Sequence, residues 1–397
     1  MAQERITWTS RIGFVLASAG AAVGLGAIWK FPYMAGTNGG PAFLPAGYLG
    51  VLTGFLVLSF YSAIGGWTLS YFCEALVGQG LITDQSQLGA HFGEFTANPV
   101  LALGFQWLFL LLNGLIVAFD VTKGIERVSK ILMPLLFFMM LAIIIRGLML
   151  PGAWAGVEFL FKFDPQAFTF SALLQAMGFT FFSLCVGCGC MMTYGSYLDD
   201  KTNVLRSCSW IAFLSVIASI MGGLMIMPSV FAFGLDPTAG PGLTFITMPA
   251  VFAQMPMGQL FAVMFYLCLA VAAITSSVSM IEILVSYLVD EQKMSRPKAA
   301  VLSTIALAVV GILPCLSFGL LSDVKMFNGR TFFDVFDFFT SNLSLPLGGL
   351  VILYLAGYTC WDRVKNTAPE KWQWLLKLML RVFSPILVLV VLISGLI

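Results

Sequence analysis

Long runs of apolar residues, separated by short polar stretches, dominate this sequence. Ten runs are long enough to be helices that cross a membrane, which takes about 20 predominantly apolar residues. They cover approximately residues 12–36, 47–72, 99–118, 131–149, 172–197, 207–233, 257–289, 299–321, 333–360 and 375–397. Glycine and proline, which are typical of turns, occur between them. The pattern predicts an all-α polytopic membrane protein with these ten transmembrane segments.

Composition agrees with this fold class. Of the 397 residues, 59% are hydrophobic and only 10% are charged, so the lipid bilayer is the expected surrounding. The net charge of +1 argues against a nucleic-acid partner. Serine, histidine and acidic residues do not cluster into a catalytic constellation, so an enzyme is not expected.

Lysine and arginine are unequally divided between the two faces of the predicted membrane protein. Twelve lie in the loops after the third, fifth, seventh and ninth segments, whereas the intervening loops hold four. Because cytoplasmic loops are rich in these residues, the twelve belong in the cytoplasm. Arg5 and Arg11 favour a cytoplasmic amino terminus, yet alternation over ten spans places it on the other side. Either these two charges are overruled, or one crossing is missing between Gly36 and Tyr48.

The first apolar segment contains Gly20, Gly24, Gly26, Lys30 and Pro32. Close packing of small residues against a neighbouring helix explains the glycines alone. A broken helix that lines a site explains the glycines, the lysine and the proline together, because the freed backbone groups then find an ion or substrate.

The segment at 172–197 has a similar interruption at Gly187 and Gly189. Two discontinuous helices in separate parts of a chain indicate a transporter site near the membrane midplane. Cys185, Cys188 and Cys190 in this segment have the spacing of metal ligands, but a zinc site takes four ligands. Lining by small residues is the alternative.

On the seventh segment, Ala272, Thr275 and Ser276 share one helix face. Their hydroxyl and carbonyl oxygens suit a small cation, whereas the alternative is that the hydroxyls bond back to their own helix. Charged residues near segment ends could lie along the same path, although snorkelling to the membrane surface is the alternative for each. These are Arg5, Lys30, Asp290 and Asp337.

Several blocks of sequence resemble the neurotransmitter:sodium symporter family. The run GFVLASAGAAVGLGAIWKFPY, followed by NGGPAF, is similar to that family's first helix. The blocks FYSAIGGWTL, SYLDD, GPGLTFITMPAVF, ITSSVSMIE and TSNLSLPLGG extend the similarity in family order over nearly the whole chain. The resemblance implies two inverted repeats of five helices, with broken first and sixth family helices. It also implies sodium-coupled symport of an amino acid.

The resemblance implies the following site residues. One sodium ion would be bound by Gly20, Val23, Ala272, Thr275 and Ser276. A second would use Ala22, Ser183 and Ser215, although the family has asparagine where this chain has Ala27. The substrate-binding positions are Ala22, Leu25, Gly26, Val57, Tyr61, Phe182, Ser183, Cys185, Cys188 and Met280. Lys30 with Asp337 corresponds to an outer gate, and Arg5 with Asp290 to an inner gate.

Within this set, Tyr61 takes the position of the tyrosine that bonds the substrate carboxylate. Val57 and Cys188 leave space for a sizeable apolar side chain. A neutral, hydrophobic or aromatic amino acid is therefore the expected substrate.

One part of the family pattern is absent from this chain. The family's second helix should precede GYLGVLTGF, but here Leu44 is followed directly by Pro45, Ala46 and Gly47. A single transmembrane domain over residues 1–397 would then comprise a first repeat without its second helix (12–149), a second repeat (172–360) and an extra helix (375–397). A multi-pass symporter of the inner (plasma) membrane, with a cytoplasmic amino terminus, is the leading interpretation. A non-transporting member that retains the fold is the alternative, and a channel ranks last because no ring of acids forms a filter.

Overall fold

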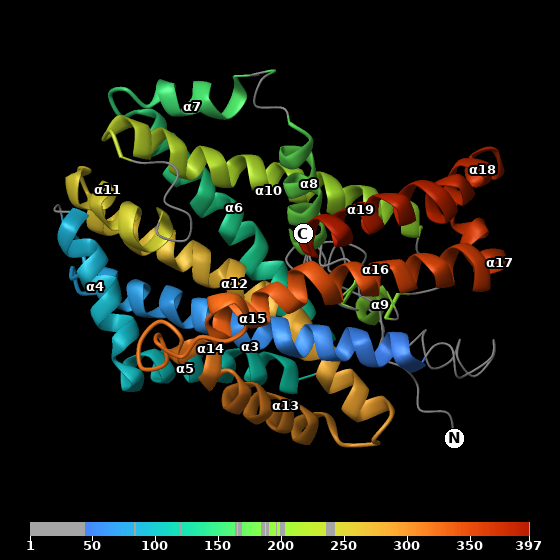
Figure 1. Ribbon diagram of the computed structural model, residues 1–397. Coiled ribbons are helices and arrows are strands. Elements are labelled where there is room, and N and C mark those ends of the chain that lie inside the picture. The colour runs from blue at the N-terminus through green and yellow to red at the C-terminus, as the bar shows by residue number, and fades with distance from the viewer. Residues whose placement is uncertain are drawn as a thin grey trace.

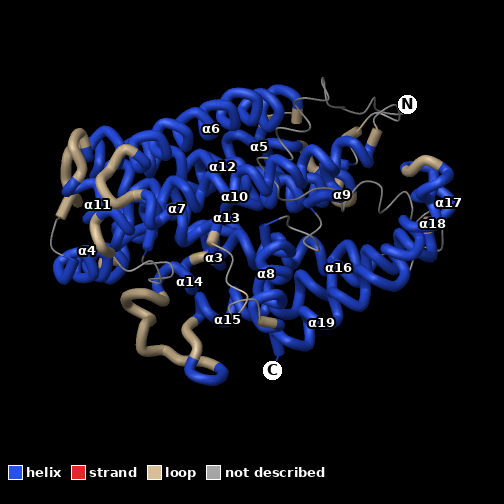
Figure 2. The backbone as a smooth tube through the Cα atoms, turned by 90° about the horizontal axis from the view of Figure 1, so that it is seen from above, coloured by secondary structure: helices blue, strands red, loops and turns tan. Residues whose placement is uncertain are grey.

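The computed structural model describes residues 44–82, 85–119, 121–162, 165, 169–183, 187, 190–195, 197–198, 203–235 and 243–396. Over these ranges the regular secondary structure is helical, and they contain no strand (Figures 1 and 2). The predicted all-α fold class is confirmed. The first apolar segment, residues 12–36, lies outside the described ranges.

Eight helices of the described chain are long and apolar enough to cross a membrane. They cover Tyr48–Leu76, Pro99–Ala118, Gly124–Leu148, Val204–Ala232, Gly258–Asp290, Arg296–Leu316, Phe332–Thr359 and Glu370–Leu396. Each coincides with a predicted apolar segment, and the one at 99–118 is reproduced to the residue. The predicted segment at 172–197 forms two shorter helices, which are described with the site.

The long spans are built from the following elements. Their α-helical parts are α3 (Leu44–Leu76), α5 (Pro99–Ala118), α6 (Arg127–Leu148), α10 (Val204–Ala232), α12 (Gly258–Asp290), α13 (Arg296–Val310), α14 (Ile312–Leu316), α15 (Phe332–Phe338), α16 (Leu345–Tyr354), α18 (Glu370–Leu378) and α19 (Ser384–Leu396). Turns of π-helix within or before them are η2 (Thr122–Glu126), η5 (Phe339–Ser344), η6 (Leu355–Thr359) and η8 (Met379–Phe383). Links outside the spans are η4 (Phe327–Gly329), α17 (Trp361–Val364) and η7 (Lys365–Thr367).

Helices α3 and α12 pack against one another at the centre of the bundle, with α5, α6 and α13 around them (Figure 1). Leu58 of α3 and Ile281 of α12 are fully buried in the hydrophobic core between these elements. By contrast, α10 and α19 bury only about one-tenth of their most apolar stretch inside the protein. Most residues of these two helices are therefore at least partly accessible in the described part of the chain.

Short elements lie at one end of the bundle, on the left of Figure 1: α4 (Gln85–Ala97), η3 (Leu243–Thr247) and α11 (Met248–Gln254). A further short helix, α7 (Trp154–Phe161), runs beside α10 at the top of Figure 1. The Asn98 side chain caps the start of α5 by accepting hydrogen bonds from the backbone amides of Val100 and Leu101. A 2.8 Å contact between His91 Nε2 and Glu74 Oε2 fastens α4 to α3.

We call the other end of the bundle the basic end. There α5 and α12 end, α3 and α13 begin, and α17 and α18 project, on the right of Figure 1. Loops at this end contain the excess of lysine and arginine residues that the charge distribution places in the cytoplasm.

Candidate functional site

The helix in the apolar segment at 172–197 is interrupted near Gly187, as the glycines of this segment predict. We call this interruption the break. Helix α8 (Phe170–Ser183) ends before it, and α9 (Cys190–Gly195) begins after it. Between them, Gly187 is buried and has a φ of 100°, in the left-handed region that favours glycine. A Cβ on Gly187 would lie 2.0 Å from the Leu345 carbonyl oxygen at the start of α16. The break is thus held by direct contact between two backbones.

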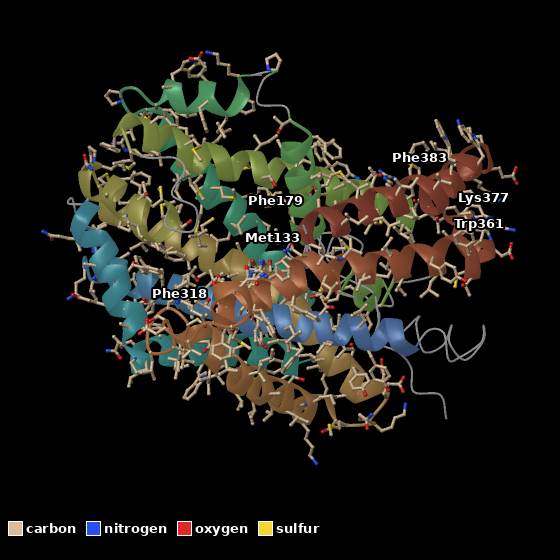
Figure 3. All side chains as sticks on the ribbon, viewed as in Figure 1. Met133, Phe179, Phe318, Trp361, Lys377 and Phe383 are labelled. Carbon is tan, nitrogen blue, oxygen red and sulfur yellow. The ribbon has the colours of Figure 1, made fainter. Side chains whose placement is uncertain are left out.

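A cavity of about 400 Å³ lies beside the end of α8. Helices α6, α10 and α12 supply its other walls, and Met133, labelled in Figure 3, is one of its lining residues. Most of the lining is apolar, but five hydroxyl-bearing residues also face the cavity. They are Ser183, Ser215, Ser219, Thr275 and Ser276. A largely apolar cavity with a few convergent oxygens is typical of a small-molecule site.

The three residues predicted to bind sodium on α12 line this cavity. Ala272, Thr275 and Ser276 occupy one helix face, as their spacing predicts. The Thr275 hydroxyl also bonds back to the carbonyls of Val271 and Ala272, each at 3.0 Å. Its hydrogen is therefore used within α12, while its oxygen lone pairs still suit a cation. The back-bonding alternative is thus observed for Thr275, and the role of its oxygen as a sodium ligand stays a prediction.

Ser183 and Ser215, predicted at the second sodium site, line the same cavity from α8 and α10. The Ser215 hydroxyl is buried and has no hydrogen-bond partner among the described residues. An orphaned buried hydroxyl beside Ser183 is compatible with an oxygen ligand for a cation. The members of both predicted sodium sites that the structure describes, on α8, α10 and α12, therefore line one cavity.

Three predicted substrate-binding residues lie in the described part of the core. Val57 and Met280 are buried in one hydrophobic cluster, and Tyr61 packs against it. Phe182 lies in the last turn of α8. Cys190, from the cysteine-rich run, is buried in the same cluster and accepts a weak hydrogen bond from Ser279.

The remaining predicted binding residues lie outside the described ranges. They are Gly20, Ala22, Val23, Leu25, Gly26, Cys185 and Cys188. The same is true of Arg5 and Lys30, one partner of each predicted gate. Their acidic partners are described: Asp337, at the end of α15, accepts a 2.9 Å hydrogen bond from Ser341, and Asp290 ends α12.

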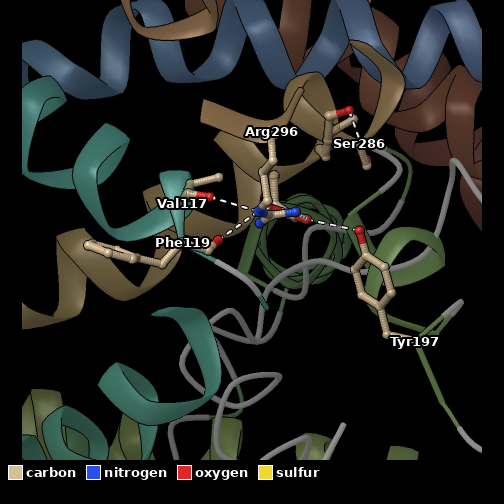
Figure 4. A network of polar contacts seen from close by, with 7 residues as sticks. Val117, Phe119, Tyr197, Ser286 and Arg296 are labelled. Atoms are coloured by element: carbon tan, nitrogen blue, oxygen red, sulfur yellow. Dashed lines mark hydrogen bonds and ion pairs between the residues drawn. The ribbon is translucent and has the colours of Figure 1, made fainter. Parts of the chain in front are cut away.

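A buried ionic network near the basic end was not predicted as part of the site (Figure 4). Glu282 of α12 is fully buried, and its carboxylate accepts hydrogen bonds from both terminal nitrogens of Arg296, at 2.5 and 3.0 Å. Tyr197, which follows α9, donates to the same carboxylate at 2.9 Å. The Nε of Arg296 donates to the carbonyls of Val117 and Phe119 at the end of α5.

This network joins four parts of the fold: the segment after the break, α12, the start of α13 and the end of α5. An acid inside an apolar helix is a sequence signal for a partner, because an isolated charge there is costly. Glu282 is such an acid within an apolar helix, but the sequence does not identify Arg296 as its partner. The Tyr197 hydroxyl thus ties the segment after α9 to α12.

Comparison with known proteins identifies the family. The model of the sodium:neurotransmitter symporter family matches residues 5–68 and 102–397. The chain belongs to this family. Its members and the relatives below are transporters, so the chain is a multi-pass membrane transport protein and not an enzyme.

Three similar proteins extend this result. An uncharacterized sodium-dependent transporter of Bacillus subtilis is 41% identical, over 88% of this chain and 87% of that protein. One from Haemophilus influenzae is 30% identical over 99% of both chains. The crystal structure of MhsT in complex with L-phenylalanine has a TM-score of 0.86 and 36% identity, covering 99% of this chain and 100% of MhsT. The Haemophilus alignment spans 455 positions, 58 more than the 397 residues of this chain.

Proposed function

We propose that the chain is a symporter that couples sodium entry to the uptake of a neutral amino acid with a hydrophobic or aromatic side chain. The observation that carries the proposal is the cavity beside the break, where Ser183, Ser215, Ala272, Thr275 and Ser276 converge from three helices. Hydroxyl and carbonyl oxygens are hard ligands that suit sodium. The substrate side chain would lie at Val57 and Met280, which are buried in the apolar core of α3 and α12 and do not line this cavity. The L-phenylalanine bound in the similar MhsT structure is of this substrate class.

Coupling between sodium and substrate would arise because both contact the first segment. Sodium would connect carbonyls of Gly20 and Val23 with the hydroxyls of Thr275 and Ser276, and so fix the first segment against α12. Tyr61 and the amides around Leu25 and Gly26 would hold the carboxylate of the substrate. Ion and substrate would then favour the same arrangement, so each would raise the affinity for the other by the same factor.

The remaining substrate positions, Ala22, Val57, Phe182, Cys185, Cys188 and Met280, would surround the side chain. Lys30 with Asp337 and Arg5 with Asp290 are the proposed outer and inner gates.

A second candidate is a member that binds its ligands but does not complete the transport cycle. The 58 extra positions in the Haemophilus alignment support it, since that relative contains residues without a counterpart here. Loss of the family's second helix from the first repeat, 12–149, would remove a neighbour of the first broken helix. The second repeat, 172–360, and the helix at 375–397 would be intact.

Uptake into proteoliposomes distinguishes the two candidates. We expect labelled phenylalanine, leucine or tryptophan to accumulate when sodium, and not potassium, is supplied outside. Excess glutamate should not compete, whereas the other hydrophobic amino acids should. Sodium-dependent binding without accumulation would favour the non-transporting candidate, and preference for glutamate would refute the substrate class.

Replacing Thr275 and Ser276 together by alanine should abolish the stimulation of substrate binding by sodium. A hydrogen-bonding or ligating contact to a charged group contributes about 1.5–3 kcal/mol, so each hydroxyl should change sodium affinity about 10–100-fold. Substrate binding to detergent-solubilised protein, titrated with sodium, measures this effect.

Ser277→Ala is the matched control for that experiment. Ser277 lies on the same helix and is buried, but its hydroxyl bonds to the Ala273 carbonyl and does not line the cavity. Its sodium titration should equal that of the wild type. Unchanged sodium stimulation in the double variant would contradict the ligand assignment.

The proposed orientation places the basic end and the amino terminus in the cytoplasm. After replacement of the exposed Cys73 and Cys208 by serine, a new cysteine at Lys325, which is exposed in the loop between α14 and α15, should react with an impermeant maleimide added to intact cells. One at Lys371 should react only after the membrane is opened. The reverse pattern would invert the orientation.

A further inference from the structure

The segment from Trp361 to Arg381 carries an unusual combination of charge and aromatic surface at the basic end. It contains five lysine and arginine residues against two acids, a net charge of +3. Asp362, one of the two acids, is already bonded to Lys365 at 2.7 Å, which lowers the pKa of its carboxyl. Tyr358, Trp372 and Trp374 in and beside this segment are exposed. Figure 3 labels Trp361 and Lys377 in the part of the chain that projects from the bundle on the right.

The Arg381 side chain is held in place by one hydrogen bond and two contacts with aromatic rings. Its Nε donates a 2.6 Å hydrogen bond to the Gly357 carbonyl, which attaches η8 to η6. Its guanidinium carbon lies 4.7 Å from the centre of the Tyr358 ring and 5.7 Å from that of Trp361. The side chain is thus oriented before any ligand arrives, and both rings favour a cation at this position.

No carboxylate of the described residues forms an ion pair with Arg381 or with Lys377, one helical turn away. Trp374, on the same continuous helix, is exposed, as tryptophans near membrane interfaces commonly are. Arg381 lies about 10 Å farther along the helix, toward the apolar α19. A cation that borders an apolar helix favours an anionic partner, because hydrocarbon offers no water to solvate it.

The surroundings of Arg381 also suit acyl chains. Val382 and Phe383 follow it directly and are exposed, as are Ile386, Leu387 and Ile393 of α19. This apolar stripe continues from the cationic cluster toward the middle of the membrane. A lipid is therefore a better fit than a soluble anion, since it supplies both a phosphate and hydrocarbon.

We propose that Arg381 and Lys377, with the rings of Tyr358 and Trp361, bind the phosphate headgroup of an anionic phospholipid in the leaflet at the basic end. The guanidinium of Arg381 would give two parallel hydrogen bonds to phosphate oxygens, and Lys377 would add a point charge. The acyl chains would lie along the exposed face of η8 and α19. The lipid would thereby brace the contact between η6 and η8.

The test compares tail-labelled phosphatidylglycerol with tail-labelled phosphatidylcholine, binding to delipidated protein in an uncharged detergent. Because a basic residue near the surface contributes about 1 kcal/mol toward an anionic lipid, the wild type should prefer phosphatidylglycerol by about tenfold or more. Arg381→Gln and Lys377→Gln should each reduce this preference about fivefold. Arg381→Lys should retain part of it, because the charge remains but the planar stacking is lost.

Lys162→Gln is the control, since Lys162 is an exposed cation outside this cluster, paired with Glu158, and should leave the preference unchanged. Lys377 is exposed, so its variant keeps the test decisive even if Arg381→Gln disturbs folding. Equal binding of both lipids, or a preference unaffected by both glutamine variants, would overturn the proposal. Full displacement of the lipid by inorganic phosphate would overturn it as well, by showing a site for a soluble anion.

Discussion

Gly187→Ala is expected to destabilise the protein by on the order of 3 kcal/mol and to abolish sodium-stimulated binding of substrate. The backbone at Gly187 has a φ of 100°, which an L-residue with a side chain rarely adopts. The added methyl group would also lie 2.0 Å from the Leu345 carbonyl oxygen and 2.9 Å from the Gly349 amide nitrogen. These are backbone atoms of α16, so a change of rotamer cannot relieve the clash. Thermal unfolding in detergent and sodium-dependent binding measure the two effects.

Gly178→Ala provides the matched control on the adjacent helix. Gly178 lies within α8, and a Cβ there would meet no atom within 4 Å. Alanine favours the helix by about 1 kcal/mol over glycine, so this variant should be at least as stable as the wild type. If Gly187→Ala has the same unfolding midpoint and the same sodium-dependent binding as Gly178→Ala, the predicted requirement for glycine at the break is wrong.

Arg296→Gln should be the most destabilising single change in the network near the basic end, at about 3–5 kcal/mol. It leaves the fully buried carboxylate of Glu282 with only Tyr197 as a charge-stabilising donor among the contacts described above. Glu282→Gln should cost less, because the Nε of Arg296 keeps its bonds to the Val117 and Phe119 carbonyls. Unfolding midpoints of both variants in detergent report the difference.

The double variant Glu282→Gln/Arg296→Gln should recover part of the stability lost in Arg296→Gln, since no buried charge remains unpaired. The Lys162–Glu158 pair is the reference for an exposed contact, with 71% and 59% of its side-chain surfaces accessible. Removing Lys162 should change stability by less than about 1 kcal/mol. Additive effects at Glu282 and Arg296 would show that the two side chains do not act as a pair.

Much of the fold could be predicted from apolar length alone. Membrane-spanning helices need continuous hydrophobic runs, and α5 matches its predicted range because Asn98 and Pro99 mark its start. The short helices α4, α7 and α11 could not be predicted in this way, since none is long enough to register as a span. They depend on packing against the long helices, as α7 packs against α10 and α11 against α12.

In the candidate site, too, local features could be predicted from the sequence, whereas contacts between distant residues could not. Glycines in an apolar run predicted the break, and helical spacing predicted that Thr275 and Ser276 share a face, because both are local properties of the backbone. The pairing of Glu282 with Arg296 depends on how the turn between α12 and α13 brings the start of α13 back against α12. The residue pattern does not determine the geometry of that turn. The predicted gates of Arg5 and Lys30 lie outside the described residues and stay predictions.

The contact between Gly187 and the start of α16 has a consequence for how this protein can evolve. The break is held by backbone atoms, whereas side chains of α6, α10 and α12 form most of the cavity wall. Mutations at Met133 or Met225 can therefore reshape the cavity without disturbing the contact that holds the two half-helices apart. The shape of the cavity and the geometry of the break therefore rest on different atoms. A lineage can change the first and keep the second.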